Sequence, residues 1–504
     1  MKKIFLLIIY SLIAFGVLLT SCINEEKYSE DTSLKLVFSA DTVTFDTILT
    51  TVGSVTKQIR VFNPSNKAVK LDYITLGGGG NSAFRLNADG DTSLIARNIV
   101  IGAKDSVFVF IRTELEPNNQ NNPLLIEDSI IFAFNKKQQS VILMAYGQDA
   151  YYHLPTRTLN SSDTPIAYSL ANDGGDKAGV VVNGNNITWK NDKPHVIIGT
   201  CAVDSVYTLN LTDNTVIYMG NNADFWVYSD ATLKAQGTLT NPVVFQSLRM
   251  QGRYASIPGQ WGKIWFWVRS KDNVLDNVKI KNATIGVIVD SCVNENPTIS
   301  MNNVSIENCS QLGLYSRGSN LYATNLMIQN TGSYSLALTL GGSYEFIGCT
   351  FANYWSYDNT RNQTVLLLND WYEASEGSIQ YRPISKCNFY NCIIYGSLLE
   401  NEIEFDLLNV LQNPDNALEL QNIYFDHCLI KSTLIKNNNN NIRDCIFNKD
   451  PMFNDVTQND LHILKTSAAK SSGNSSYNAV VPYDIFGVLR SAPPAIGAAE
   501  YTEQ

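Results

Sequence analysis

A short pattern recurs seven times between residues 277 and 445, and it limits the architectures open to this chain more than any other feature. In each copy, apolar and polar residues alternate. The last residues of successive copies lie 26, 22, 23, 38, 36 and 17 positions apart. Most of these spacings exceed a single hairpin and are typical of solenoid coils, in which every second residue faces inward. The copies are NVKIKNA (277–283), NVSIENC (303–309), NLMIQNT (325–331), GCTFANY (348–354), KCNFYNC (386–392), NIYFDHC (422–428) and NNNIRDC (439–445).

The polar residue near the end of each copy is expected to form a column along the solenoid. Stacked asparagine side chains can hydrogen-bond to the coils above and below, which satisfies amides that burial would otherwise leave unpaired. We interpret His427, which departs from this ladder, as a core or end-of-ladder residue and not as a catalyst. The predicted column is Asn282, Asn308, Asn330, Asn353 and Asn391, followed by His427 and Asp444.

Several segments resemble the right-handed parallel β-helix family of bacterial proteins, in which asparagine ladders mark a bend. The resemblance implies an all-β chain with a right-handed parallel β-helix over residues 155–501. It does not identify a reaction, because one solenoid scaffold carries many functions. Lys263 stands where the family usually has a second glycine. The matching segments are TLKAQGT (232–238), NPVVFQS (241–247), GQWGKIWF (259–266), DPMF (450–453), DLHIL (460–464) and AIGAAEY (495–501).

Cysteines recur within the repeats. A small apolar residue repeated in a solenoid favours a packing column. Because coils stack about 4.8 Å apart, disulfides between some of these thiols remain an alternative. Zinc is disfavoured, since the chain has no C-x-x-C pair and only four scattered histidines; we expect no metal and no cofactor. Cys309, Cys392, Cys428 and Cys445 directly follow the ladder position, whereas Cys349 and Cys387 share another position.

Residues 35–150 consist of short alternating strands separated by turn signals. In SVFVFIR (106–112) the valines and Ile111 face one way and the two phenylalanines the other. About seven such strands predict an antiparallel β-sandwich. The region resembles immunoglobulin-like modules of bacterial surface proteins, but it lacks their Cys…Trp…Cys signature because no cysteine lies between Cys22 and Cys201.

The first residues predict export and lipid anchoring. Two lysines precede an apolar run that is short for a membrane span, which indicates a signal peptide over 1–21. Its end, LTSC, resembles a bacterial lipobox, which implies acylation of Cys22 and anchoring in the outer membrane. The acidic tether 22–34 resembles the signal that sends lipoproteins of Bacteroidota to the exterior face of that membrane; a simple solvated tether is the alternative.

Charge argues against one class of partner. The formal net charge is −10 at pH 7, and charged residues are spread along the chain. Because the sequence shows no basic patch, we expect no nucleic acid to bind.

Two aromatic clusters are the candidate binding surfaces. In WGKIWFWVR (261–269), alternation turns Ile264, Phe266 and Val268 inward, so the intervening residues face outward, where paired tryptophans beside basic groups suit a sugar or a protein. A second cluster flanks the strand VLLLN (365–369) within an extended spacing of the repeat. In each case the alternative is that the aromatics are covered or themselves cover a coil. The candidates are Trp265, Trp267, Arg269, Trp355, Tyr357, Trp371 and Tyr372.

The repeats themselves predict no catalytic residues. Polysaccharide-cleaving sites need carboxylates, paired or metal-binding, on one outer face, and no acidic pair falls on adjacent coils at the outward position that follows the inward isoleucine. The leading hypothesis is therefore a non-enzymatic surface lipoprotein that binds a glycan or a protein partner, including as an accessory subunit of an outer-membrane assembly. The alternative is a polysaccharide lyase or glycosidase of the β-helix type.

Overall fold

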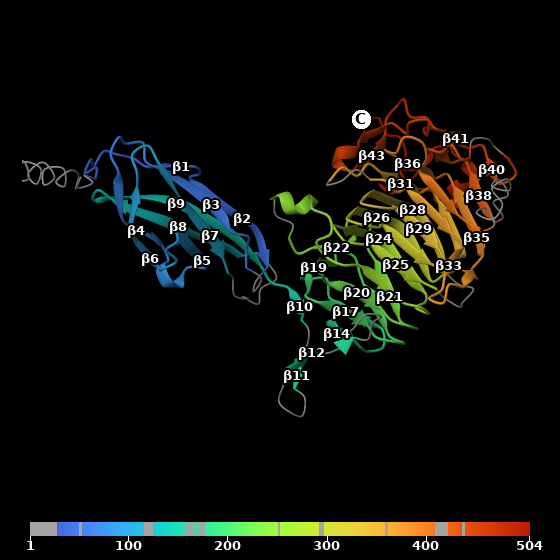
Figure 1. Cartoon of the computed structure of the whole chain (residues 1–504), viewed down its shortest axis with the longest axis horizontal. Coiled ribbons are helices and arrows are strands. Elements are labelled where there is room, and N and C mark those ends of the chain that lie inside the picture. The colour runs from blue at the N-terminus through green and yellow to red at the C-terminus, as the bar shows by residue number, and fades with distance from the viewer. Residues whose placement is uncertain are drawn as a thin grey trace, which may run out of the picture. The chain divides into compact units, whose positions relative to one another are not determined.

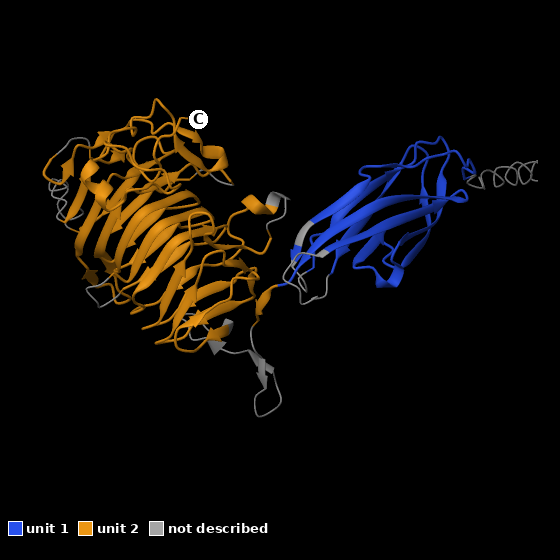
Figure 2. Cartoon of the chain, turned by 180° about the vertical axis from the view of Figure 1, so that it is seen from behind, with its two compact units in different colours: residues 1–149 blue, residues 150–504 orange. Residues whose placement is uncertain are grey.

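The chain divides into two compact units, residues 1–149 and 150–504 (Figure 1, Figure 2). The predicted signal peptide and Cys22 lie outside the described residues. Within those residues, no helix has the length and apolar character needed to cross a bilayer. The computed structural model describes residues 28–503 except 50–52, 115–123, 155–156, 160–164, 168, 171–176, 250–251, 292–296, 358–360, 409–421 and 436–438.

The first unit is a β-sandwich of a four-stranded and a five-stranded sheet. As the alternation predicts, Val109 and Ile111 are buried, whereas Phe108 and Phe110 are exposed. Pairing is antiparallel except between β2 and β9. The sheets contain β1 (Val37–Phe38), β3 (Lys57–Phe62), β7 (Ser106–Thr113) and β5 (Phe84–Ala88), then β2 (Thr42–Leu49), β9 (Lys137–Gln148), β8 (Leu124–Phe134), β4 (Val69–Leu76) and β6 (Ile95–Ile101); η1 spans Gly79–Asn81.

The second unit is a parallel β-helix, so the predicted fold class is confirmed. Each regular coil contributes one strand to a ten-stranded sheet and a bent strand, or two short strands, to an eighteen-stranded sheet (Figure 1). The ten-stranded sheet contains β13 (Ser169–Leu170), β14 (Lys177–Val182), β17 (Thr200–Val203), β20 (Asp224–Val227), β23 (Ile264–Phe266), β25 (Val287–Asp290), β27 (Leu314–Arg317), β29 (Leu336–Thr339), β32 (Leu366–Asn369) and β37 (Ile403–Asp406).

The eighteen-stranded sheet begins at β10, which pairs in parallel with β16 and forms the first rung of the solenoid. Its strands are β10 (Tyr151–His153), β15 (Ile187–Thr188), β16 (His195–Ile197), β18 (Thr208–Leu211), β19 (Val216–Met219), β21 (Thr232–Gln236), β22 (Val243–Ser247), β24 (Asn273–Lys281), β26 (Ile299–Cys309), β28 (Asn320–Thr331), β30 (Gly342–Ile347), β31 (Thr350–Asn353), β35 (Ile384–Tyr390), β36 (Ile393–Gly396), β38 (Ile423–Asp426), β39 (Leu429–Ile430), β40 (Ile442–Arg443) and β41 (Ile446–Phe447).

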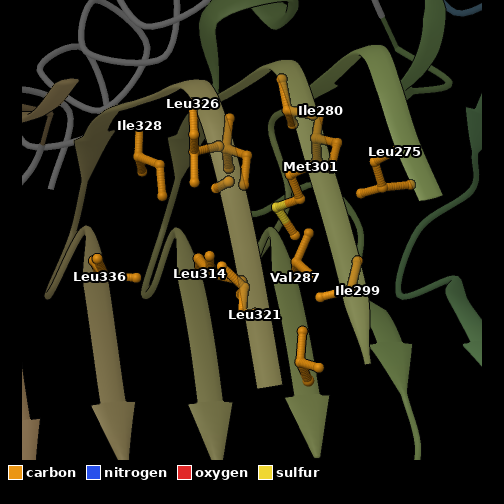
Figure 3. Packing of buried hydrophobic residues seen from close by; sticks show 14 of the residues in the cluster. Leu275, Ile280, Val287, Ile299, Met301, Leu314, Leu321, Leu326, Ile328 and Leu336 are labelled. Atoms are coloured by element: carbon orange, nitrogen blue, oxygen red, sulfur yellow. The ribbon is translucent and has the colours of Figure 1, made fainter. Parts of the chain in front are cut away.

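The core of the β-helix is a stack of similar apolar layers. Leu314 and Leu336 of the ten-stranded sheet occupy equivalent places in successive coils, and Ile280 and Ile328 occupy equivalent places two coils apart in the other sheet (Figure 3). All four side chains are fully buried. The repeat therefore fixes the fold by placing an apolar residue at the same inward position of each coil.

Two columns of residues form the bends of each coil, and all their members except Asn353 have the left-handed backbone that asparagine tolerates. The register aligns Asn282, Asn308, Asn330 and Asn353, and Asn330 donates to Asn308 Oδ1 at 2.5 Å. The prediction that Asn391, His427 and Asp444 belong to this column is wrong. The other column contains Asn277, Asn303, Asn325, Gly348, Asn391, His427 and Asp444.

The cysteines also regroup in the observed register. Cys349, Cys392, Cys428 and Cys445 occupy one position in four successive coils, whereas Cys309 pairs across from Thr331. All are free and buried. Burial raises the pKa of the Cys349 and Cys428 thiols, which keeps them protonated. They act here as small packing residues, and the structure has no disulfide among them.

The C-terminal segment packs against the outer side of the eighteen-stranded sheet. Arg490 donates to Asn325 Oδ1 at 2.7 Å, and Ala498 N donates to Thr350 Oγ1 at 2.9 Å. Small hairpins and 3-10 helices complete the unit: β11 (Arg157–Leu159), β12 (Pro165–Ala167), β33 (Trp371–Glu373), β34 (Ile379–Tyr381), β42 (Phe453–Asp455), β43 (Asp460–Ile463), η2 (Gly252–Ser256), η4 (Val456–Gln458) and η5 (Ser475–Ala479).

Candidate functional site

The outer face of the ten-stranded sheet carries the predicted tryptophans. Ile264 and Phe266 point into the core, so Trp265 between them points outward. Parallel pairing aligns the outward residues of successive coils into columns with a spacing of about 4.8 Å. One column consists of Ala202, Trp226, Trp265, Ile288, Tyr315, Ala337, Leu367 and Glu404.

The aromatic residues in the first half of this column form a covered layer. Trp226 is fully buried, and Trp265 is only 9% exposed. Trp265 stacks on Trp267 with ring centroids 4.6 Å apart and meets Trp226 edge-on at 5.6 Å. The predicted direction of Trp265 is correct, but its predicted exposure is wrong because large residues in adjacent coils cover it. Trp267 is partly buried and lies at the edge of the layer.

Charged groups surround this layer. Asp290 accepts from Trp265 Nε1 at 2.9 Å and from Arg317 Nε and Nη2 at 2.5 and 2.8 Å. The Arg317 guanidinium lies 5.6 Å from the Trp265 ring centroid, and Lys263 Nζ lies 5.4 Å from it. Two cations thus flank one indole, an arrangement that holds the layer together electrostatically.

Arg269 does not contact the tryptophan layer through its charged group, which pairs with Asp230. β23 ends at Phe266, and the chain turns so that Arg269 has a φ of 69°. Val268 is therefore 44% exposed, contrary to its predicted inward direction. Arg269 is exposed and pairs with Asp230 at 2.9 Å.

A second aromatic group, on the β33–β34 hairpin, remains open. Trp371 and Tyr381 are directly opposite in the antiparallel register. Tyr381 is 53% exposed and Tyr372 is 36% exposed, while Trp371 is partly buried. Trp371 Nε1 donates to Asp406 Oδ1 at 3.1 Å, which ties the hairpin to the outer face of the sheet.

Carboxylates and an amide lie beside this hairpin. Asp406 also accepts from Asn369 Nδ2 at 2.8 Å, and Glu404 accepts from the Tyr334 hydroxyl at 2.9 Å. Glu404 and Asp406 share one face of β37, because Ile403 and Phe405 pack against the core. Asp370 follows β32 and is largely buried; this burial raises the pKa of its carboxyl. Asp370 in turn contributes, after burial, to the raised pKa of Tyr381.

Trp355 and Tyr357 belong to another part of the coil. Trp355 is 6% exposed and lies against Gly332, where an added Cβ would be 3.4 Å from its ring. Tyr357 is 53% exposed, with its ring centroid 5.9 Å from that of Trp355. Gly332 precedes β29, whereas Trp371 follows β32, so the two aromatic pairs lie near opposite ends of the strands of the ten-stranded sheet.

Sequence reasoning missed the acids of this face because it compared only the strand that carries the repeat motif. On the motif strands of two adjacent coils, Lys281 of β24 and Glu307 of β26 form an ion pair at 2.6 Å. The signal for the missed acids was the alternation in IEFD (403–406), which places both acids on one face. Among the described residues, no group of three or more histidine, cysteine or acidic side chains could hold a metal ion.

Comparison with known proteins gives only distant likeness. No family model and no curated protein matches the chain. A GH87 α-1,3-glucanase from Streptomyces thermodiastaticus matches with a TM-score of 0.23 and 10% identity, over 74% of this chain and 79% of that one. A family 123 glycoside hydrolase from Clostridium perfringens matches with a TM-score of 0.17 and 8% identity, over 24% of this chain and 30% of that one. A protein of unknown function from Porphyromonas gingivalis W83 matches with a TM-score of 0.18 and 12% identity, over 25% of this chain and 56% of that one. These scores are too low to argue function.

Proposed function

We propose that the protein is a surface lipoprotein that binds a glycan on the outer face of the ten-stranded sheet, around Asp406. The observation that carries this proposal is the set of side chains at the β33–β34 hairpin: Trp371 and Tyr381 side by side, with Asp406 and Asn369 beside them. Aromatic rings can stack on the apolar faces of a sugar, while carboxylates and amides bind its hydroxyls.

The shape of the scaffold also supports a glycan. Coils spaced by about 4.8 Å repeat hydrogen-bonding groups along the solenoid axis. From Arg317 on β27 the outer face continues through Thr339 and Asn369 to Asp406 in successive coils. An extended chain of sugars can contact several coils at once, so we expect an oligosaccharide to bind more tightly than a monosaccharide.

Lipid anchoring at Cys22 and exposure at the exterior of the outer membrane are part of the proposal, supported by the lipobox-like LTSC and the acidic residues that follow it. We expect Cys22→Ser to release the protein from the membrane fraction. If the variant stays with the membrane fraction after a salt wash, lipid anchoring through Cys22 is contradicted. An accessory role in an outer-membrane assembly would appear as a partner protein co-purifying from membranes.

A glycan array probed with the full-length protein tests the binding proposal. We expect binding to a restricted set of glycans and a loss of at least tenfold in affinity for the double variant Trp371→Ala/Tyr381→Ala. The matched control is Phe108→Ala/Phe110→Ala, which removes two exposed rings from the sandwich and should leave binding unchanged. Absence of any glycan binding, or equal binding by both double variants, would contradict the proposal.

Glycoside hydrolysis is a second candidate, favoured by one observation. A glycosidase needs one carboxyl that stays protonated and one that is ionised. Burial raises the pKa of the Asp370 carboxyl, as suits the acid, and the second carboxyl of the pair is the neighbouring Asp406, which accepts hydrogen bonds from Asn369 and Trp371. If this reading is right, new reducing ends will appear when the bound glycan is incubated with the protein, and Asp370→Asn will abolish them.

A further inference from the structure

A groove on the other sheet has the composition of a second ligand site. It lies between the C-terminal segment and the outer face of β24, β26 and β28, and it has a volume of about 340 Å³. That volume is at the lower end of the range for small-ligand sites, about 300–1,000 Å³. The groove is separate from the face around Asp406, which belongs to the ten-stranded sheet.

The floor of the groove is a grid of outward side chains from three adjacent coils. Alternation with inward Val278 and Ile280 turns the two lysines of β24 outward. The register then aligns each lysine with one residue of β26 and one of β28. The two rows are Lys279, Ser305 and Met327, and Lys281, Glu307 and Gln329.

One polar atom of this floor has no partner. Gln329 is 5% exposed; its Nε2 donates to Glu307 Oε2 at 3.1 Å, but its Oε1 is buried and accepts no hydrogen bond. A buried acceptor without a donor is energetically unfavourable. A ligand that brings a hydroxyl group into the groove would satisfy it.

The walls of the groove are largely apolar. Phe486 and Ile485 line the groove. Phe486 is 42% exposed, and the His462 ring stacks on the Phe486 ring with centroids 4.0 Å apart. Leu239 also lines the groove and closely approaches Gly487, where an added Cβ would lie 2.3 Å from Leu239 Cδ2. The groove thus combines an open aromatic ring with a hydrogen-bonding floor, which are the two elements that recognise a sugar.

The charge of the groove selects among sugars. The Lys281 ammonium is neutralised by Glu307 at 2.6 Å. Lys279 is exposed, and in the described part of the chain no acidic side chain pairs with it. The lining therefore carries one uncompensated positive charge, which favours a ligand with one negative charge.

We propose that this groove binds a mono- or disaccharide carrying a single carboxylate. The ring would stack on Phe486, a hydroxyl would donate to Gln329 Oε1, and the carboxylate would pair with Lys279. This site is independent of the glycan site proposed around Asp406, and either can exist without the other.

Saturation-transfer NMR on the full-length protein tests this proposal with matched sugars. The probes are the methyl glycosides of glucuronic, galacturonic and mannuronic acid, each paired with its neutral parent hexose. We expect at least one acid to bind at least fivefold more tightly than its parent. Lys279→Met should abolish that preference, and Phe486→Ala should weaken the acid at least fivefold. Both side chains are exposed, so both variants should fold.

Controls separate this site from the other one. Lys70→Met and Phe108→Ala change exposed residues of the sandwich and should leave acid binding unchanged. Trp371→Ala should also leave it unchanged, whereas it weakens the glycan proposed to bind around Asp406. Binding of none of the acids, equal binding of acids and parents, or acid binding unaffected by Phe486→Ala would overturn the proposal.

Discussion

Trp265 and Trp371 both lie on the outer side of the ten-stranded sheet, yet only the second belongs to an open surface. Trp265 is 9% exposed and packs between Trp226 and Trp267. Trp371 is partly buried, stands opposite the exposed Tyr381 and donates to Asp406. One tryptophan therefore belongs to a covered layer, and the other lies beside an exposed tyrosine.

The neighbours in adjacent coils explain the difference. Beside Trp265 the outward column continues with Trp226 and Ile288, which are large enough to cover it. Farther along, the column passes to Ala337, Leu367 and Glu404, so bulky rings no longer cover one another and the hairpin aromatics stay accessible. In a solenoid, exposure of an outward residue is thus decided by its neighbours one coil away, about 4.8 Å distant.

The contrast between covered and open side chains is sharpest for two acids of one segment. Glu402 is buried against Arg361 at 2.7 Å, whereas Glu404 faces outward. Glu402→Gln leaves an unpaired buried guanidinium, and we expect it to lower the free energy of unfolding by about 3–5 kcal/mol. Glu404→Gln should cost less than about 1 kcal/mol.

Denaturant unfolding followed by tryptophan fluorescence measures both variants, because all seven tryptophans lie in the β-helix. The double variant Arg361→Met/Glu402→Leu should recover part of the loss. Equal stabilities for Glu402→Gln and Glu404→Gln would show that the covered acid is not held as described.

The covered tryptophan gives the next largest effect. Trp265→Ala removes a buried ring and its hydrogen bond to Asp290, so we expect a loss of about 3 kcal/mol. Trp265→Phe should retain much of the packing and lose less. A melting temperature for Trp265→Ala equal to that of the wild type would break the comparison, since it would mean that the layer is open.

A covered pair of imidazoles at the start of the β-helix adds a pH dependence. His153 Nε2 and His195 Nδ1 are 2.9 Å apart, and Trp189 stacks on His153 at 4.2 Å. Burial, and then the charge of His195, lower the pKa of His153 to about 4, against about 6.5 in an unfolded chain. Between these values the unfolded chain binds a proton that the folded chain does not, so stability falls as pH falls.

The loss should begin below pH 6.5 and reach up to about 3 kcal/mol near pH 4. His153→Phe removes this contribution, so the stability difference between wild type and variant should shrink or reverse on acidification from pH 7 to pH 4. Parallel pH profiles for the two proteins would contradict the assignment.

The ladder should give the smallest of these effects. Asn330→Leu removes the donor to Asn308 Oδ1 and leaves that oxygen with fewer partners, which we expect to cost about 1–2 kcal/mol. Asn330 also has a φ of 55°, which a leucine adopts less readily. Asn330→Gly removes the backbone strain but does not restore the hydrogen bond to Asn308. If both variants have the melting temperature of the wild type, the stability of the bend does not depend on the Asn330 side chain.

The repeats alone were sufficient to predict the fold, because inward apolar positions such as Ile280, Ile306 and Ile328 are set by local alternation. They were not sufficient to assign Asn391 to its column. An asparagine follows an alternating triplet at both bends of a coil, so the local pattern does not say which bend it marks. Long-range pairing decides this: β35 aligns with β30, which places Asn391 beside Gly348.

The candidate site was predicted only in part for a related reason. Alternation gives the side of the sheet to which Trp265 points, but its cover comes from residues tens of positions away in sequence, such as Trp226. The outward direction of Glu404 and Asp406 could be predicted from the same alternation, because they alternate with Ile403 and Phe405. The position of Tyr381 could not be predicted in this way, since its place opposite Trp371 depends on the register of the hairpin.

The most direct test of the central claim is to measure glycan affinity and melting temperature together for Trp371→Ala and Trp265→Ala, using a glycan identified on the array. We predict that Trp371→Ala loses at least tenfold in affinity with a melting temperature within about 2 °C of the wild type, whereas Trp265→Ala melts lower and, where folded, binds as the wild type does. The reverse pattern, with Trp265→Ala losing affinity at full stability and Trp371→Ala binding normally, would contradict the account.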